Sequence, residues 1–391
     1  VRLINAVQGG VMITTFMFPG QGSQAKGMGA GLFDRFKELS AQADRVLGYS
    51  IKELCLVDPG GRLSLTQFTQ PALYVVNALT YYARLEDDAT PADFVVGHSL
   101  GEFNALLAAG CFDFETGLQL VKKRGELMGQ ISGGAMAAIL NANKNDIELT
   151  LARSGLDDIG VANYNTPSQF VISGPVEQIE ASEALFQNAP MRYLRLNTSG
   201  AFHSKLMQPA ADVFAAFLDA FTFVSPIIPV FANFSARPYE SNQIADGLAK
   251  QMASPVRWCE SVQHLLEFAA GSGQEASFEE LGHGEVLTRL VHAIRRQTPV
   301  AENRVVSDAS ALDKRGQPNL LPVLGTQTSS AHEKVTAWNL NCPVGTKVRS
   351  LLIDYPSLET CTEAMVLFGH RPVVYMKGYN GYFDIDEVMG V

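Results

Sequence analysis

Asp93-Phe94-Val95-Val96-Gly97-His98-Ser99-Leu100-Gly101 is the stretch that decides the fold of this chain. The apolar run 94–96 predicts a short buried strand, and the residues after Ser99 are rich in helix formers up to Gly110. A Gly-x-Ser-x-Gly pattern between a strand and a helix is typical of a nucleophile elbow, in which a sharp turn presents the serine at a helix N-terminus. Ser99 is therefore the candidate nucleophile, and the expected fold class is α/β.

Composition limits the possible functions. The chain has 391 residues, of which 47% are hydrophobic, and a formal net charge of −10. This size allows more than one domain, and the acidic balance argues against nucleic acid or an anionic membrane surface as a partner. No apolar run reaches the roughly 18 residues of a membrane span. Five cysteines without a C-x-x-C pair predict reduced thiols in a cytoplasmic enzyme.

The N-terminal region predicts a first strand and a glycine-rich loop. Met12 directly precedes the strand over 13–18 and is a candidate natural start, with residues 1–11 as an upstream extension. The spacing Gly20-x-Gly22-x-x-Ala25, with Asp44 about 20 residues further on, matches a dinucleotide fingerprint. That fingerprint needs a second strand ending at the acid, whereas 32–47 has the apolar spacing of one amphipathic helix. We therefore expect the loop to present Gln21 into a site.

Further helices and strands continue this α/β pattern. A cap signal before Pro71 predicts a helix to about Arg84, and a third helix runs from Asp113 through Met128. Arg124 falls on the apolar side of that third helix, where an arginine ordinarily extends its charged end to solvent. A strand over 227–232 ends at Asn233, and a helix is expected over 285–296.

Residues 135–197 have a different pattern of predicted strands and helices. Strands are predicted over 135–140, 159–163, 169–173 and 191–196, with helices over 144–154 and 176–187. The order βαββαβ is the ferredoxin-like signature, so this segment is expected to be a small subdomain inserted into a large one made of 12–134 and 198–297.

The C-terminal quarter is expected to be separate. Residues 298–331 are polar and weakly periodic, which predicts a linker. Residues 332–391 predict a small β-rich module, with strands over 347–353 and 372–377 and a hairpin turn at Asn380-Gly381 before 382–385. Nothing in this module points to a chemical role.

Five motifs in order resemble one family. They are Phe18-Pro19-Gly20-Gln21-Gly22-Ser23-Gln24, Thr69-Gln70-Pro71-Ala72, Gly97-His98-Ser99-Leu100-Gly101-Glu102, Lys123-Arg124-Gly125-x-Leu127-Met128 and Ala201-Phe202-His203-Ser204. The set resembles malonyl-CoA:acyl carrier protein transacylases, and 97–128 is closest to the stand-alone, trans-acting acyltransferases that serve modular polyketide synthases. The resemblance covers about 12–297 and implies an α/β-hydrolase-like large domain with a ferredoxin-like insert.

A serine hydroxyl needs a general base. Among the seven histidines, His203 is the candidate because it lies where the chain re-enters the large subdomain and in a matching motif. His98 is the weaker rival, since its side chain should point away from its neighbour's hydroxyl and line the pocket. The resemblance implies that the backbone carbonyl of Gln251, rather than an acid, orients the imidazole. It also implies an oxyanion hole made by the N–H groups of Leu100 and Gln21.

The resemblance also implies the acyl specificity. Arg124 would bind the free carboxylate of malonyl, because a guanidinium fork matches a carboxylate bidentately. Methylmalonyl-selective relatives tend to have a serine at the position of Phe202, so the aromatic favours unsubstituted malonyl. Gln70 and Asn233 are the remaining expected pocket residues, together with His98. No metal and no permanently bound cofactor are expected; the substrates are malonyl-CoA and the phosphopantetheine thiol of an acyl carrier protein.

Three alternatives remain open at this stage. The same fold serves proofreading hydrolases that free carrier proteins of stalled acyl groups, although these act on neutral chains and Arg124 argues against that role. The enzyme could serve fatty-acid rather than polyketide synthesis. Finally, the 332–391 segment could make the chain a scaffold or docking protein.

Overall fold

The computed structural model describes residues 12–198, 200–298, 331–350, 358–360, 364–367, 371–375, 382–384 and 388–390. The chain divides into two compact units, Val1–Thr298 and Pro299–Val391, which are described separately.

A five-stranded sheet forms the centre of the first unit. Its strand order is β8 (Arg237–Pro238), β7 (Val230–Ala232), β2 (Phe94–Gly97), β1 (Met12–Phe18) and β9 (Glu275–Glu280). All neighbours run parallel except β8, which is antiparallel to β7. The carboxyl ends of the four parallel strands therefore meet at one edge, which is where open α/β sheets usually bind ligands.

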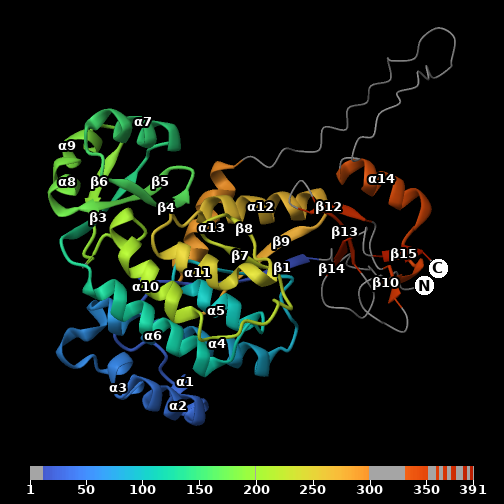
Figure 1. Ribbon diagram of the computed structural model, residues 1–391, viewed down its shortest axis with the longest axis horizontal. Coiled ribbons are helices and arrows are strands. Elements are labelled where there is room, and N and C mark those ends of the chain that lie inside the picture. Colours follow the sequence, from blue (N-terminus) through green and yellow to red (C-terminus); the bar gives the residue numbers. More distant parts are fainter. Residues whose placement is uncertain are drawn as a thin grey trace, which may run out of the picture. The chain divides into compact units, whose positions relative to one another are not determined.

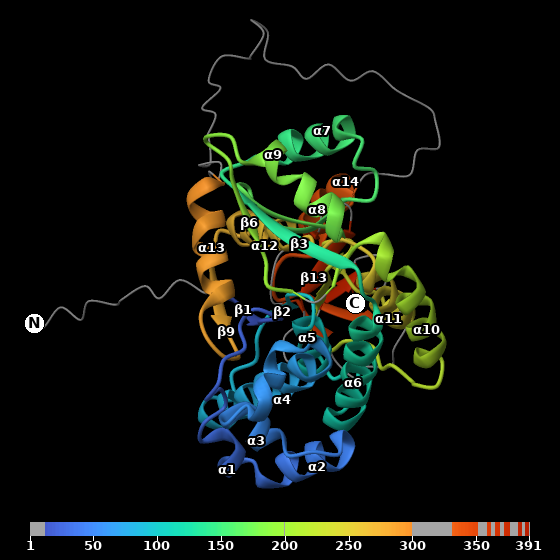
Figure 2. The same ribbon diagram turned by 90° about the vertical axis from the view of Figure 1, so that its left-hand side faces the viewer.

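Helices accompany this sheet, some in contact with its strands and others packed on those helices. They are α1 (Leu32–Arg35), α2 (Lys37–Leu47), α3 (Ile51–Leu56), α4 (Thr66–Asp87), α5 (Gly101–Ala108), α6 (Phe114–Gln130), α10 (Gln208–Leu218), α11 (Ile244–Met252), α12 (Trp258–Gly271) and α13 (Val286–Gln297). Helix α5 contacts β1, β2 and β7, while α12 and α13 contact β9. Both views show α4 and α6 on one side of the sheet and α12 and α13 on the other (Figures 1 and 2).

A second, antiparallel sheet occupies the middle of the sequence. Its strand order is β4 (Gly160–Thr166), β5 (Gln169–Pro175), β3 (Gly134–Leu140) and β6 (Arg192–Arg195), covered by α7 (Lys144–Ser154), α8 (Val176–Ala181) and α9 (Glu183–Phe186). The chain order is the predicted strand-helix-strand-strand-helix-strand, with one helix divided in two. A parallel bridge between Asn163 and Val256 joins this sheet to the segment before α12.

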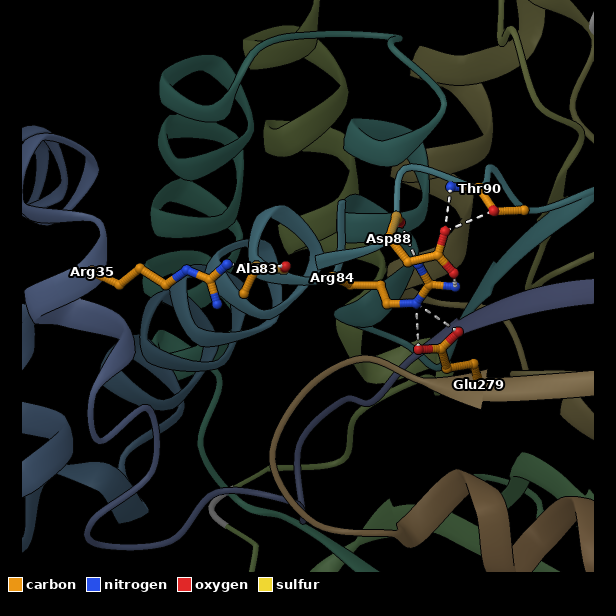
Figure 3. Close-up of polar contacts among 6 residues, drawn as sticks. All are labelled: Arg35, Ala83, Arg84, Asp88, Thr90 and Glu279. Atoms are coloured by element: carbon orange, nitrogen blue, oxygen red, sulfur yellow. Dashed lines mark hydrogen bonds and ion pairs between the residues drawn. The ribbon is translucent and has the colours of Figure 1, made fainter. Parts of the chain in front are cut away.

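Arg84 fastens the C-terminal end of α4 to the large sheet (Figure 3). Its Nε donates to both carboxylate oxygens of Glu279 on β9, at 2.8 and 3.1 Å, and its Nη2 lies 3.2 Å from Asp88. Asp88 in turn accepts from the backbone N–H and hydroxyl of Thr90. The charged loop that leads into β2 is thus anchored at its start.

Three helix and strand predictions are wrong in their limits. The helix expected over 32–47 is interrupted at Phe36, whose φ of −114° and ψ of 58° are not helical. Helix α4 begins at Thr66, so Pro71 lies inside it rather than in its first turn. The strand expected from 227 begins only at Val230, since Pro226 and Pro229 have no N–H to give to a sheet.

The second unit contains an element that the sequence did not predict, the helix α14 (Ala331–Asn341). Its described strands are β10 (Lys347–Ser350), β11 (Leu358–Glu359), β12 (Met365–Leu367), β13 (Arg371–Tyr375), β14 (Tyr382–Asp384) and β15 (Val388–Gly390). Strands β13 and β14 pair antiparallel, on either side of the predicted Asn380-Gly381 turn. That turn, the linker residues 299–330 and residues 1–11 lie outside the described residues.

Candidate active site

The elbow has the strained geometry that its pattern predicts. Strand β2 ends at Gly97, α5 begins at Gly101, and Ser99 between them has a φ of 51°. A side chain other than hydrogen is excluded at both glycines by the backbone: a Cβ on Gly97 would lie 2.0 Å from the Gly101 carbonyl, and one on Gly101 would lie 1.9 Å from Phe18 O. The glycines therefore let β1, β2 and α5 approach closely enough to form the turn.

This close approach predicts that adding one methyl group at Gly101 strongly lowers the stability of the fold. We expect Gly101→Ala to lower the free energy of unfolding by about 3 kcal/mol, because rigid backbone faces the new Cβ. Urea unfolding followed by circular dichroism measures the change. Gly271→Ala is the matched control, since a Cβ at that helix-terminal glycine meets nothing within 4 Å. Equal stability of the two variants would contradict the close approach.

His203 lies against the serine. Its Nδ1 donates to the backbone carbonyls of Gln251 and Ser254, at 2.9 and 3.2 Å, which leaves Nε2 as an acceptor for the Ser99 hydroxyl at 2.7 Å. Like Ser99, His203 has a left-handed backbone, with a φ of 59°. Burial, and then the charge of Arg124, lower the pKa of His203 to about 3. The imidazole is therefore neutral near pH 7 and can accept a proton.

Arg124 is buried beside the same hydroxyl, with only 1% of its surface exposed, and does not extend to solvent. Its Nη1 donates to Gln70 Oε1 at 2.6 Å, and its Nη2 donates to Gln251 Oε1 at 2.8 Å and to Ser99 Oγ at 3.2 Å. Its Nε has no hydrogen-bond partner among the described residues. Burial lowers the pKa of Arg124 to about 10, with the charge of Glu102 opposing this, so the guanidinium remains charged at neutral pH.

A cavity of about 240 Å³ opens over these three residues. Three parts of the first unit line it: Gln21, Gln70, His98, Leu100 and Phe202 from segments around the five-stranded sheet, Met136, Ala138, Asn163, Asn165 and Val171 from the four-stranded sheet, and Val286, Leu287 and Leu290 from α13. The volume suits a short acyl group rather than a whole CoA molecule.

The backbone N–H groups of Gln21 and Leu100 belong to residues at the wall of this cavity. Within the described part of the chain, neither N–H donates a hydrogen bond, and both residues line the cavity. The Gln21 side chain accepts from Thr66 Oγ1 at 3.0 Å, which holds the glycine-rich loop beside α4. Two free donors beside the nucleophile can stabilise a developing oxyanion.

His98 points away from the nucleophile, as expected for its direct neighbour. Its Nε2 lies 2.9 Å from Asn165 Oδ1 in the small subdomain, and its ring lies 5.7 Å from that of Trp258. Burial lowers its pKa, which the Asn165 contact opposes. This contact connects the segment after β2 with β4 at the wall of the cavity.

The expectation that Asn233 lines the pocket is wrong. Asn233 lies beneath the elbow, where its Oδ1 accepts from the Ser99 N–H and its Nδ2 donates to Gly97 O, both at 2.7 Å. The amide is placed there because Asn233 follows β7, the neighbour of β2, at the shared carboxyl edge of the sheet. Its contacts hold the turn rather than a ligand.

The sequence reasoning also missed a buried polar group. Glu102 stands in the 97–102 motif without a predicted role. An acidic residue in the first turn of a helix is favoured by the helix dipole alone, so the pattern does not single it out. Its side chain is fully buried and contacts Gln251 and Tyr239. Gln251 itself contributes its side chain as well as the expected carbonyl.

Two other kinds of site are absent from the described ranges. No group of three or more His, Cys, Asp or Glu side chains there could hold a metal ion. Of the helices that the structure describes, none combines the length and apolar character needed to cross a membrane. Cys55, Cys111 and Cys259 are buried free thiols, whereas Cys361 lies outside the described part.

Comparisons with known proteins agree on one family. The acyl transferase domain family matches residues 15–332. The polyketide biosynthesis malonyl CoA-acyl carrier protein transacylase PksC of Bacillus subtilis is 51% identical over 284 residues, covering 72% of this chain and 97% of PksC. The polyketide biosynthesis protein PksE of the same organism is 50% identical over 285 residues, which are 72% of this chain but only 36% of PksE.

A solved structure resembles the first unit. The crystal structure of a malonyl CoA-acyl carrier protein transacylase from Burkholderia pseudomallei has 66% sequence identity and a TM-score of 0.73. The match covers 74% of this chain and all of that chain.

Proposed function

The chain belongs to the acyl transferase domain family, and from this premise we propose that it moves a malonyl group from malonyl-CoA, through a Ser99 ester, to the phosphopantetheine thiol of an acyl carrier protein. The observation that carries the proposal is a buried guanidinium 3.2 Å from the nucleophile hydroxyl. A buried cation at the wall of a cavity favours an acyl group that brings its own carboxylate. The names of PksC and PksE place the reaction in polyketide biosynthesis.

The first half-reaction uses the Ser99–His203 pair. As Ser99 Oγ attacks the thioester carbonyl, its proton passes to His203 Nε2 over the 2.7 Å hydrogen bond. Collapse of the tetrahedral intermediate breaks the C–S bond, and the proton on Nε2 goes to the departing CoA sulfur. The Gln251 carbonyl fixes the tautomer and ring angle, as a carboxylate does in a Ser-His-Asp triad. The second half-reaction reverses these steps with the carrier thiol as the nucleophile.

The negative oxygen of that intermediate would lie between the N–H groups of Leu100 and Gln21. Removing one such donor typically costs about 3 kcal/mol of transition-state stabilisation. The helix dipole of α5 acts in the same direction, since Leu100 immediately precedes its first residue.

Arg124 would bind the acyl carboxylate and also adjust the base. Its charge is the second cause of the low pKa of His203. A bound carboxylate offsets that charge, so the pKa of His203 should rise when a malonyl group is present and His203 becomes a stronger base. Phe202, which lines the cavity, limits the room for a substituent on the acyl α-carbon.

The domain organisation is part of the proposal. We take the five-stranded sheet with its helices as an α/β-hydrolase-like large subdomain, and residues 135–197 as a ferredoxin-like insert that closes over its carboxyl edge. The strand orders of the two sheets and the shared cavity support this division.

The test is loading followed by transfer. After incubation with malonyl-CoA, intact-mass spectrometry should detect one malonyl ester on the enzyme, and a carrier protein bearing phosphopantetheine should then remove it and gain the same mass. Acetyl-carrier protein is offered in a parallel reaction. Fast hydrolysis of that thioester without malonyl loading would contradict the proposal and favour a proofreading hydrolase.

A further inference from the structure

Glu102 is a buried acid that the proposed mechanism does not use. It lies one turn after Ser99 in α5 and is fully buried. Its Oε2 accepts from the Asn233 N–H at 3.0 Å and from Gln251 Nε2 at 3.1 Å, and its Oε1 accepts from the Tyr239 hydroxyl. All three neighbours can donate, so the site satisfies the ionised form of the carboxylate.

The amide of Gln251 connects this carboxylate to the guanidinium. Its Nε2 donates both to Glu102 and to Ser99 O, the latter at 2.7 Å, so its Oε1 must face the other way and accept from Arg124 Nη2 at 2.8 Å. A flipped amide would direct N–H groups at the cation and leave the carboxylate without that donor. Glu102 therefore orients the side-chain amide of Gln251 so that its oxygen contacts Arg124.

The two charges are also coupled directly. Burial raises the pKa of Glu102 to about 7, against the hydrogen bonds that the carboxylate accepts and, as the smallest effect, the charge of Arg124. Glu102 in turn supports the charged form of Arg124. An acyl carboxylate entering the cavity would compete with Glu102 for the same cation.

We propose that Glu102 is a positioning residue that sets the strength with which Arg124 holds the acyl carboxylate, by orienting Gln251 and by sharing the positive charge of the guanidinium. This inference rests on the proposed function, because it assumes that Arg124 binds that carboxylate. Moderate binding of the acyl carboxylate suits a two-step transfer. An interaction that is equally strong in the ground state and in the transition state lowers KM without raising kcat.

The test is Glu102→Gln, which keeps the size and can keep all three hydrogen bonds. Its Oε1 can accept from Asn233 and Gln251, and its Nε2 can donate to Tyr239 Oη. Loss of the competing charge should lower KM for malonyl-CoA by about tenfold without raising kcat, and leave KM for acetyl-CoA unchanged. Glu126→Gln, which removes an equal charge from α6 two residues beyond Arg124, is the matched control and should leave both KM values unchanged.

An unchanged or higher malonyl-CoA KM in folded Glu102→Gln would overturn the inference. If that variant does not fold, Gln251→Met is a second test of the inference. It removes the side-chain amide but keeps the backbone carbonyl that accepts from His203. The inference expects Gln251→Met to lose malonyl preference over acetyl, and unchanged preference would overturn it. Arg124→Ala separates the two proposals. If this variant retains the wild-type preference for malonyl, the proposal that Arg124 binds the acyl carboxylate is wrong. If it loses that preference and Glu102→Gln has no effect, only the proposed role of Glu102 is wrong.

Discussion

Ser99→Ala should give a folded protein that forms no acyl-enzyme with malonyl-CoA. The hydroxyl contacts both the His203 base and the Arg124 guanidinium, so Ser99 Oγ is the expected attacking atom. Removing the nucleophile from a serine-base pair typically lowers kcat by about 10⁴- to 10⁶-fold. Intact-mass spectrometry after incubation with malonyl-CoA measures the ester directly, and transfer to the carrier protein should fall with it.

Ser64→Ala is the control for this experiment. Ser64 is exposed at the end of a short helical turn, and its hydroxyl donates only to Gly61 O. This variant should load malonyl at the wild-type rate. A malonyl ester that persists on the Ser99→Ala protein would show that another side chain is the nucleophile, and the mechanism would have to be abandoned.

Much of the arrangement could be predicted from the sequence because it depends on local patterns. The strand-glycine-serine-helix pattern predicts the turn at Ser99, since only glycine permits the backbone contacts on either side of it. Helix 144–154 has the predicted limits because Asn143 caps its first turn and Gly155 ends it in a left-handed conformation. These signals lie within a few residues of the structure that they determine.

The missed features depend on contacts between distant segments. Glu102 and Gln251 are 149 residues apart, and their hydrogen bond exists only because α5 and the end of α11 meet beneath the cavity. The break at Phe36 leaves the apolar spacing of a single helix intact, so periodicity could not reveal it. The place of Asn233 after a strand does not reveal the direction of its amide, which is set by its contacts with Ser99 and Gly97.

Arg124→Lys should separate charge from geometry in acyl selection. Lysine keeps a positive charge near Glu102, so the buried carboxylate retains a counter-charge and the fold should persist. It cannot reproduce a planar fork that serves Gln70, Gln251 and a carboxylate at once. We expect malonyl loading to fall by at least about thirtyfold while acetyl loading changes little. Truncating one partner of a buried, hydrogen-bonded charge pair usually costs about 2–5 kcal/mol, and about 2 kcal/mol corresponds to roughly thirtyfold.

Arg124→Ala should lose the preference for malonyl altogether, with an added loss of stability from the unpaired charge of Glu102. Loading of malonyl-CoA and acetyl-CoA, measured in one competition by intact mass, gives the preference independently of the amount of folded protein. Lys123→Ala is the matched control: its ammonium lies 5.8 Å from the centre of the Phe217 ring rather than in the cavity, so removing it should not alter the ratio. If Arg124→Lys and Arg124→Ala both keep the wild-type ratio of malonyl to acetyl loading, the buried guanidinium does not bind the acyl carboxylate. Selection for malonyl must then come from the shape of the cavity around Phe202.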